Sequence, residues 1–232
     1  MSLRRVRVDH LSPGENVLPS QQEHYLARVL RLRDGDPVEL FDGQGNRGHG
    51  QVVLREDRLM VQVDALEADP RPAVALTVAA ATPKGDRADW LVEKIAELGA
   101  VSLQWIDTER SVVKLQEGSK KLERFARLAD SAARQSGQSW TLAIHPPLPF
   151  DTFLAQPFDA KWIAHPGGTT VGATGPGSIA VLIGPEGGFT DDEVTRAQGA
   201  GYMAVSLADT ILRVETAAVA ATVLVHAAAK SR

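Results

Sequence analysis

A glycine-rich loop with a single acid is the first candidate for chemistry in this sequence. Residues 180–190 read AVLIGPEGGFT, an apolar run followed directly by glycines, a proline and Glu186. Pro185 presets φ for the second position of a β-turn, and Gly187 suits the fourth position. Because Gly187 and Gly188 lack side chains, a ligand can approach the backbone closely here. A tight connector between a strand and a helix is the alternative interpretation.

The residues that this loop lacks narrow the class of ligand. No Lys-Ser or Lys-Thr follows the glycines, so the loop is not a P-loop, and its spacing is not the G-x-G-x-x-G of dinucleotide sites. A carboxylate repels a phosphate, so Glu186 argues against phosphate binding. The loop is better suited to a neutral or cationic ligand that backbone amides and carbonyls recognise.

A second candidate is the segment ILRVETA, which precedes a run of small residues. Glu215 lies at the expected N-terminus of a helix, where the helix dipole favours an acid. Arg213 either pairs with Glu215 or Glu186, or faces a ligand crevice and meets an anionic or carbonyl-bearing substrate.

Metal chemistry is not indicated. The six histidines show no ligand spacing, and the absence of cysteine removes disulfides and thiolate sites. His165 stands beside Pro166, Gly167 and Gly168 at the end of an expected strand, where it either lines a pocket or is a structural histidine.

Strands that alternate with helices must position these candidates. Apolar runs predict strands in 74–80, 101–107, 161–166, 179–185 and 203–209. The sequence predicts helices in 86–99, 119–137 and 215–230, and a further helix that Thr190 and Glu193 open as a capping box. This pattern predicts an α/β fold with a mostly parallel sheet, whose ligands bind beyond the carboxyl ends of the strands.

The N-terminal part of the chain follows a different pattern. Residues 4–66 contain short β-branched runs and a glycine-rich turn region, interrupted by one helix expected over 20–32 with a Ser20/Glu23 capping box. This suggests a small β-barrel. The segment EADPRPA at 67–73 breaks both periodicities and marks a domain boundary.

Composition argues against a disordered, a secreted or a membrane-spanning protein. The chain has 232 residues, 44% of them apolar, which is enough for a packed core. The net charge of −4 does not indicate a nucleic-acid binder, yet residues 1–33 hold six arginines against three acids, and such a patch can bind phosphates. We find neither a secretion signal nor a membrane-spanning stretch, so a cytoplasmic protein is expected.

Longer motifs resemble those of the RsmE family. IGPEGGFT and SLADTILRVETA are preceded by ATPKGDRADWLVEKIAELGA, TERSVVK and RQSGQ, and the similarity extends to HYLARVLRLRDGDPVELFDGQGN near the N-terminus. Members of this family are SPOUT-class enzymes that methylate N3 of a uridine in small-subunit (16S) ribosomal RNA, with S-adenosylmethionine as cofactor.

The resemblance implies a fold and an assembly. Residues 1–69 would form a PUA-like, RNA-binding β-barrel, and residues 74–232 a SPOUT methyltransferase domain with an α/β trefoil knot. The protein would be a homodimer that completes each site with the partner chain, without a metal or a membrane. Three loops would bind the cofactor through His165, Pro166, Leu182, Ile183, Gly184, Gly187, Gly188, Ser206, Leu207, Ala208, Ile211 and Leu212.

The resemblance also suggests roles in catalysis and RNA binding. Arg213 would stabilise negative charge on the uracil, while the proton acceptor is left open among Glu215, Glu186 and Asp209. The residues expected to hold RNA phosphates are Arg4, Arg5, Arg28, Arg31, Lys84, Arg110 and Lys114.

Two motifs depart from the family pattern. Leu-Gly-Pro-Arg is replaced by Leu207-Ala208-Asp209-Thr210, and the arginine of Gln-Ser-Gly-Arg by Gln138. Loss of the two arginines is expected to weaken RNA binding or to change the RNA target. Ala208 adds a methyl group where the backbone and the cofactor are expected to come close. Two alternatives therefore stay open, namely a SPOUT methyltransferase with another RNA target and a non-catalytic RNA-binding or ribosome-assembly protein.

Overall fold

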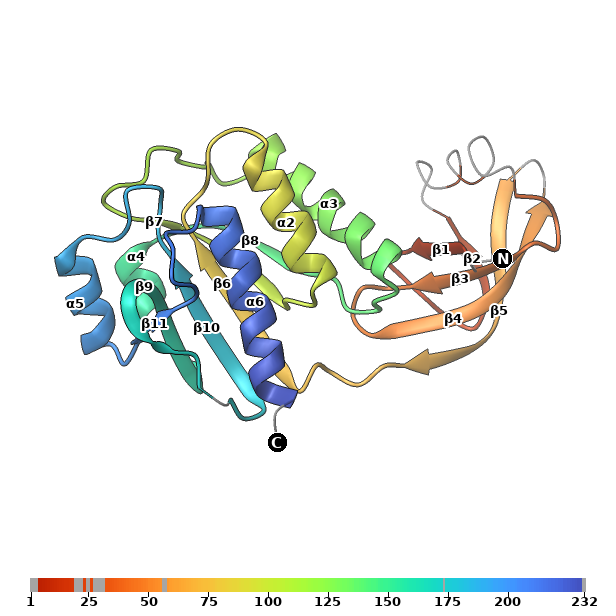
Figure 1. The fold of residues 1–232 in the computed structure, drawn as a ribbon. Coiled ribbons are helices and arrows are strands. Elements are labelled where there is room, and N and C mark those ends of the chain that lie inside the picture. The colour runs from red at the N-terminus through yellow and green to blue at the C-terminus, as the bar shows by residue number, and fades with distance from the viewer. Residues whose placement is uncertain are drawn as a thin grey trace. The chain divides into compact units, whose positions relative to one another are not determined.

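The computed structural model describes residues 4–18, 23, 26, 32–55, 58–172 and 174–230 (Figure 1). The chain divides into two compact units, each of which contains two stretches of sequence. The first unit comprises Met1–Arg71 and Ala133–Thr141, and the second comprises Pro72–Ala132 and Leu142–Arg232.

The first unit is built on a five-stranded sheet in the order β1-β3-β4-β5-β2. Its β1 and β3 pair in parallel, and the other neighbours pair antiparallel. The strands are β1 (Arg4–Arg7), β2 (Gly14–Val17), β3 (Pro37–Phe41), β4 (Asn46–Arg55) and β5 (Arg58–Ala68). This arrangement agrees with the β-rich composition of the N-terminal part of the chain.

Alternation of apolar and polar residues gives this sheet its buried face. Val6, Leu40 and Val61 belong to one apolar cluster, in which each side chain is buried. The β4–β5 pairing shifts register between His49 and Gly50. A Cβ at Gly50 would lie 2.2 Å from the Gln62 carbonyl oxygen, so only glycine fits this close approach.

The helix predicted over 20–32, including Ser20 of its capping box, falls almost entirely outside the described residues. Glu23 is described, and its Oε1 accepts a hydrogen bond from the Leu59 amide at 3.0 Å. Arg28 and Arg31 also lie outside the described residues.

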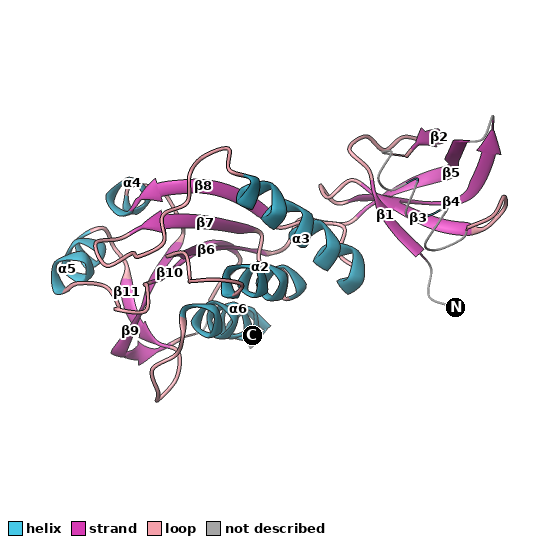
Figure 2. Cartoon of the chain, turned by 90° about the horizontal axis from the view of Figure 1, so that it is seen from above, coloured by secondary structure: helices cyan, strands magenta, loops and turns pink. Residues whose placement is uncertain are grey.

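The second unit is a six-stranded parallel sheet in the order β11-β9-β10-β6-β7-β8 (Figure 2). Its strands are β6 (Val74–Ala80), β7 (Ser102–Asp107), β8 (Ala143–Pro149), β9 (Ala160–Thr170), β10 (Gly177–Ile183) and β11 (Met203–Ser206). The predicted α/β class is confirmed.

Helices cover both faces of this sheet (Figure 2). On one face, α2 (Arg87–Glu97), α3 (Lys120–Ser136) and α6 (Val214–Lys230) share an apolar cluster with Val78 and Val181. On the other face, α4 (Phe150–Leu154) and α5 (Asp191–Gly199) pack with Ala79 and Leu182. Neighbouring residues of one strand therefore enter opposite cores, which explains the continuous apolar runs in the sequence.

One strand of this sheet was missed by the sequence analysis. β8 contains Pro146, Pro147 and Pro149, and proline removes a backbone donor from a ladder. The strand lies at the edge of the sheet, beside β7 alone, where missing donors can face away from the neighbouring strand. Within the described part of the chain, no helix is both long and apolar enough to span a bilayer.

Candidate functional site

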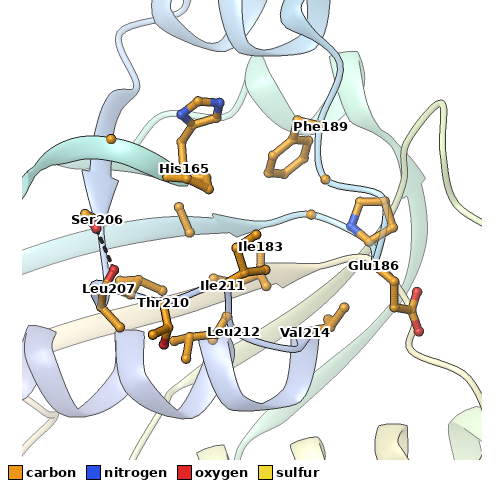
Figure 3. A pocket seen from close by; sticks show the side chains of 18 of the residues that line it. His165, Ile183, Glu186, Phe189, Ser206, Leu207, Thr210, Ile211, Leu212 and Val214 are labelled. Atoms are coloured by element: carbon orange, nitrogen blue, oxygen red, sulfur yellow. Dashed lines mark hydrogen bonds between the residues drawn. The ribbon is translucent and has the colours of Figure 1, made fainter.

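A cavity of about 610 Å³ lies where three segments that follow the sheet strands come together (Figure 3). We call it the strand-end cavity. Its walls are Ala164–Gly167 from β9, Ile183–Phe189 after β10, and Ser206–Leu212 after β11, with Val214 and Ala217 of α6. This is the edge at which open α/β sheets bind ligands.

The first wall exists because β9 leaves its ladder and returns to it. β9 pairs with β11 at Ile163 and again at Thr169, and residues 164–168 loop out between these positions. Gly167 has a φ of 79°, which favours glycine. At Gly168 an added Cβ would lie 2.6 Å from the backbone of Val205. The expected strand therefore does not end at His165, as the sequence suggested, but continues to Thr170.

The second wall is the glycine loop, Gly184–Gly188. The Gly188 amide donates to the Pro185 carbonyl at 2.8 Å, and Gly188 has a φ of 69°. The β-turn therefore starts at Pro185, one residue later than the sequence predicted, and places Glu186 and Gly187 at its centre. A Cβ at Gly184 would lie 3.0 Å from the Phe189 ring, so the loop packs tightly on the ring that follows it.

The predicted capping box anchors the end of this loop. The Thr190 hydroxyl accepts from the Glu193 amide at 3.2 Å, and Glu193 Oε2 accepts from the Thr190 amide at 2.8 Å. The box is thus confirmed, and α5 begins immediately after the glycine loop. Phe189 is buried against Phe150, with 5.5 Å between the ring centroids.

The third wall is the connection from β11 to α6. The Ser206 hydroxyl donates to the Ala208 carbonyl at 3.0 Å, a bond drawn in Figure 3. The side chain of Ile211 is 88% exposed. Ala208, whose methyl group departs from the family pattern, is exposed and leaves the cavity open.

The structure brings together nearly all the residues predicted to bind the cofactor. Those that line the strand-end cavity are His165, Pro166, Ile183, Gly184, Gly187, Gly188, Ser206, Leu207, Ala208, Ile211 and Leu212. Leu182 does not line it, because this residue of β10 points into the core beneath α4 and α5.

The charged groups of the cavity wall are acidic. Glu186 and Asp209 line it, and no lysine or arginine does so among the residues that the structure describes. Both acids belong to exposed parts of the wall, and Figure 3 shows the Glu186 carboxylate at the rim, away from the apolar side chains. Such a cavity disfavours a phosphate and suits a ligand with positive charge.

Arg213 and Glu215 lie beside the cavity but do not line it. Arg213 is exposed, and within the described residues it forms no ion pair with Glu215 or Glu186, so that structural interpretation fails. Glu215 is 8% exposed; its Oε1 lies 3.8 Å from Arg87 Nε, and its Oε2 has no hydrogen-bond partner in the described structure. The sequence analysis did not predict that Arg87 lies beside Glu215, because the two residues are far apart in the sequence.

The basic residues predicted to bind RNA differ in their exposure and in their contacts. Lys84 and Lys114 are exposed on loops that follow β6 and β7. Arg110 is exposed too, but its Nη1 donates to the Gly187 carbonyl at 2.8 Å. Arg5 is largely buried, pairs with Glu39 and donates to the carbonyls of Ala133 and Gln138, so it serves the first unit internally. Arg4 is partly exposed on β1.

No group of three or more histidine, aspartate or glutamate residues within the described ranges is arranged to hold a metal ion.

Comparison with protein families identifies both parts of the chain. Residues 70–226 match an RNA methyltransferase domain, and residues 18–59 match the PUA domain of RNA methyltransferases. A protein of Synechocystis named ribosomal RNA small subunit methyltransferase E is 32% identical over 224 residues, which is 92% of this chain and 73% of that protein. The protein of that name from Mycobacterium bovis is 30% identical and covers 88% of this chain and 83% of its own length.

Two solved structures share this fold along their whole length. A ribosomal RNA small subunit methyltransferase E from Neisseria gonorrhoeae, bound to S-adenosylmethionine, has a TM-score of 0.89 at 29% identity, with 98% of each chain covered. A methyltransferase from Legionella pneumophila, also with bound S-adenosylmethionine, has a TM-score of 0.89 at 27% identity, with 99% of each chain covered.

Proposed function

The chain belongs to the RNA methyltransferase family, and from this premise we propose that it methylates N3 of a uridine in small-subunit ribosomal RNA. The methyl donor is S-adenosylmethionine, the cofactor bound in the similar structures. The observation that carries the proposal is the strand-end cavity, whose wall holds two carboxylates and no lysine or arginine among the described residues.

The residues of the cavity fit this cofactor. The volume of about 610 Å³ is in the range of small-molecule sites. The glycine loop presents backbone groups at close range, and its Gly188 adopts a φ of 69°. When bound, S-adenosylmethionine supplies a methyl group on a positively charged sulfonium. Glu186 and Asp209 provide an electrostatic environment that tolerates this charge, which a P-loop lysine would oppose.

Arg213 is the residue that we assign to the nucleobase. Uridine must lose its N3 proton as the new N–C bond forms, and negative charge then develops on the carbonyl oxygens of the uracil. Arg213 is exposed beside the cavity, at the start of α6, and its guanidinium forms no ion pair in the described structure. It can therefore donate hydrogen bonds to those oxygens and stabilise the transition state. Placement of N3 alone contributes up to roughly 7–11 kcal/mol.

The three candidate proton acceptors differ in their surroundings. Glu186 and Asp209 line the cavity and are exposed, so either can receive the N3 proton directly or through water. Glu215 is buried beside Arg87 and does not line the cavity, so it is the least accessible of the three candidates. The target base must be unpaired or extruded to reach this position.

RNA binding is proposed for the exposed basic residues on the loops after the strands. Lys84, Arg110, Lys114 and Arg213 all occupy such loops. Arg5 is not included, because its guanidinium is used inside the first unit.

A homodimer is proposed from the exposed apolar side chains of the second unit. Ile211 is 88% exposed, Val223 of α6 is 46% exposed, and Trp90 of α2 is 43% exposed. The proposal requires that a partner chain covers these side chains, because contiguous apolar surface of more than a few hundred Å² marks an interaction site. A partner chain that covers Ile211 would also close the strand-end cavity. We expect this dimer to act in the cytoplasm, where ribosomal subunits are made.

Methyl transfer from labelled S-adenosylmethionine tests the proposed function. Unmodified small subunits and free 16S ribosomal RNA are the two acceptors, and large-subunit RNA is the control. We expect label in at least one small-subunit acceptor. If no acceptor is labelled although the cofactor binds, the substrate assignment is wrong; if the cofactor does not bind, the enzymatic assignment is wrong.

A further inference from the structure

Arg110 holds the glycine loop from outside. It lies on the segment that follows β7, and its Nη1 donates to the Gly187 carbonyl at 2.8 Å and, more weakly, to the Phe189 carbonyl at 3.5 Å. A Cβ at Gly187 would lie 3.4 Å from Arg110 Cδ, so the aliphatic part of the side chain also lies against the loop. The side chain thus contacts the wall of the strand-end cavity through both its polar and its apolar parts.

A buried carboxylate fixes the backbone on which Arg110 stands. Glu193 is 1% exposed, and its Oε1 accepts from the Glu109 amide at 2.8 Å while Oε2 accepts from the Thr190 amide at 2.8 Å. Thr190 Oγ1 also donates to Glu109 Oε2 at 3.3 Å. The segment after β7 is therefore joined at Glu109, directly before Arg110, to the residues that follow the glycine loop, and a displacement of one is transmitted to the other.

The rest of the guanidinium is available to a ligand. Arginine has five N–H donors in a planar fork, and only Nη1 is bonded in the described structure. The residue is exposed, and Lys114, four positions later on the same segment, is exposed as well. Nε and Nη2 can therefore bind a phosphate oxygen while Nη1 keeps its bond to the loop.

We infer that Arg110 is a positioning residue that couples RNA binding to cofactor binding: one edge of its guanidinium holds the Gly187 carbonyl and the other binds an RNA phosphate. The inference rests on the proposed function, because it requires both ligands. A phosphate on Arg110 fixes the guanidinium and hence the glycine loop, so RNA strengthens cofactor binding. By reciprocity, the cofactor strengthens RNA binding by the same factor.

Calorimetric binding of S-adenosylhomocysteine, with and without saturating unmodified 16S ribosomal RNA, measures this coupling without turnover. We expect the unaltered protein to bind S-adenosylhomocysteine about 5–10-fold more tightly in the presence of RNA. In Arg110→Ala the ratio of the two affinities should fall to about 1. In Arg110→Lys, which keeps the charge but loses the planar fork, the ratio should also fall while RNA affinity stays close to that of the unaltered protein.

Lys114→Ala is the matched control. Lys114 lies on the same segment and is proposed to bind a phosphate, but unlike Arg110 it has no hydrogen bond to the glycine loop in the described structure. This substitution should weaken RNA binding and leave the ratio unchanged. A purely structural role of Arg110 would weaken S-adenosylhomocysteine equally with and without RNA, and an unchanged ratio in both Arg110 variants would overturn the inference. If the unaltered protein binds both ligands with a ratio of 1, the inference alone fails; if it binds neither, the proposed function fails.

Discussion

Gly168→Ala should damage the strand-end cavity although Gly168 does not line it. The new methyl group would lie 2.6 Å from the backbone nitrogen and carbonyl carbon of Val205, and 2.7 Å from the carbonyl carbon of Ala204. These are backbone atoms of β11, which cannot rotate away as a side chain would. The two strands must therefore separate by roughly 0.8 Å to restore an ordinary contact of about 3.4 Å.

The consequence reaches the cavity along the chain. The clash occurs where β9 rejoins β11, next to the pairing of Thr169 with Val205. Ser206, the first residue of the third wall, follows Val205 directly. Overpacking of this kind costs about 1–3 kcal/mol. We expect the urea midpoint to fall by about 0.5–1 M. Because the wall is displaced, S-adenosylhomocysteine should bind at least about tenfold more weakly, equivalent to about 1.4 kcal/mol.

Urea unfolding and calorimetric titration with S-adenosylhomocysteine measure the two effects separately. Gly172→Ala is the matched control, because its added Cβ would meet nothing within 4 Å and its φ is not in the left-handed region. The control should match the unaltered protein in both assays. If Gly168→Ala binds the ligand with unaltered affinity, the argument that this contact positions the third wall is refuted.

Three further predictions concern other groups. Arg213→Ala should lower kcat by about 10²-fold with unchanged S-adenosylhomocysteine affinity, since Arg213 does not line the cavity; single-turnover rates and calorimetry test this, and an unchanged rate would remove its role. Burial raises the pKa of Tyr202 to about 12, so the folded state keeps this proton to a higher pH than the unfolded state does. The contribution of Tyr202 to the free energy of unfolding is therefore fully present below pH ~10 and is lost as the pH rises towards 12. Tyr202→Phe should abolish that decline and cost little at pH 7, because the buried hydroxyl has no hydrogen-bond partner in the described structure; a large loss of stability at pH 7 would contradict this. Lys114→Ala should reduce the slope of log affinity for RNA against log salt by about 0.7, measured by filter binding, and an unchanged slope would exclude a phosphate contact.

The sequence predicted those features of the fold that depend on local patterns. Apolar runs located five of the six strands of the second unit, and the Thr190–Glu193 spacing located the start of α5. β8 was missed because its prolines mask a strand that only its edge position makes acceptable. The excursion of β9 at His165–Gly168 was also missed, because it depends on pairing with β11, a strand more than thirty residues later in the chain.

The candidate site was likewise predicted where it depends on local patterns and missed where it depends on tertiary contacts. Three loops were predicted to converge, since each follows an expected strand, and eleven of the twelve expected cofactor residues line the cavity. Residue orientation could not be predicted, because it depends on tertiary contacts. Leu182 turns into the opposite core, Arg5 is used inside the first unit, and Arg87 meets Glu215 from a distant segment.

The most direct measurement of the central claim is the position of the transferred methyl group. Unmodified small subunits are incubated with the protein and labelled S-adenosylmethionine, and the RNA is digested to nucleosides for mass spectrometry. The proposed chemistry predicts 3-methyluridine as the labelled product. A label on the ribose, on another base, or on no nucleoside at all would contradict it.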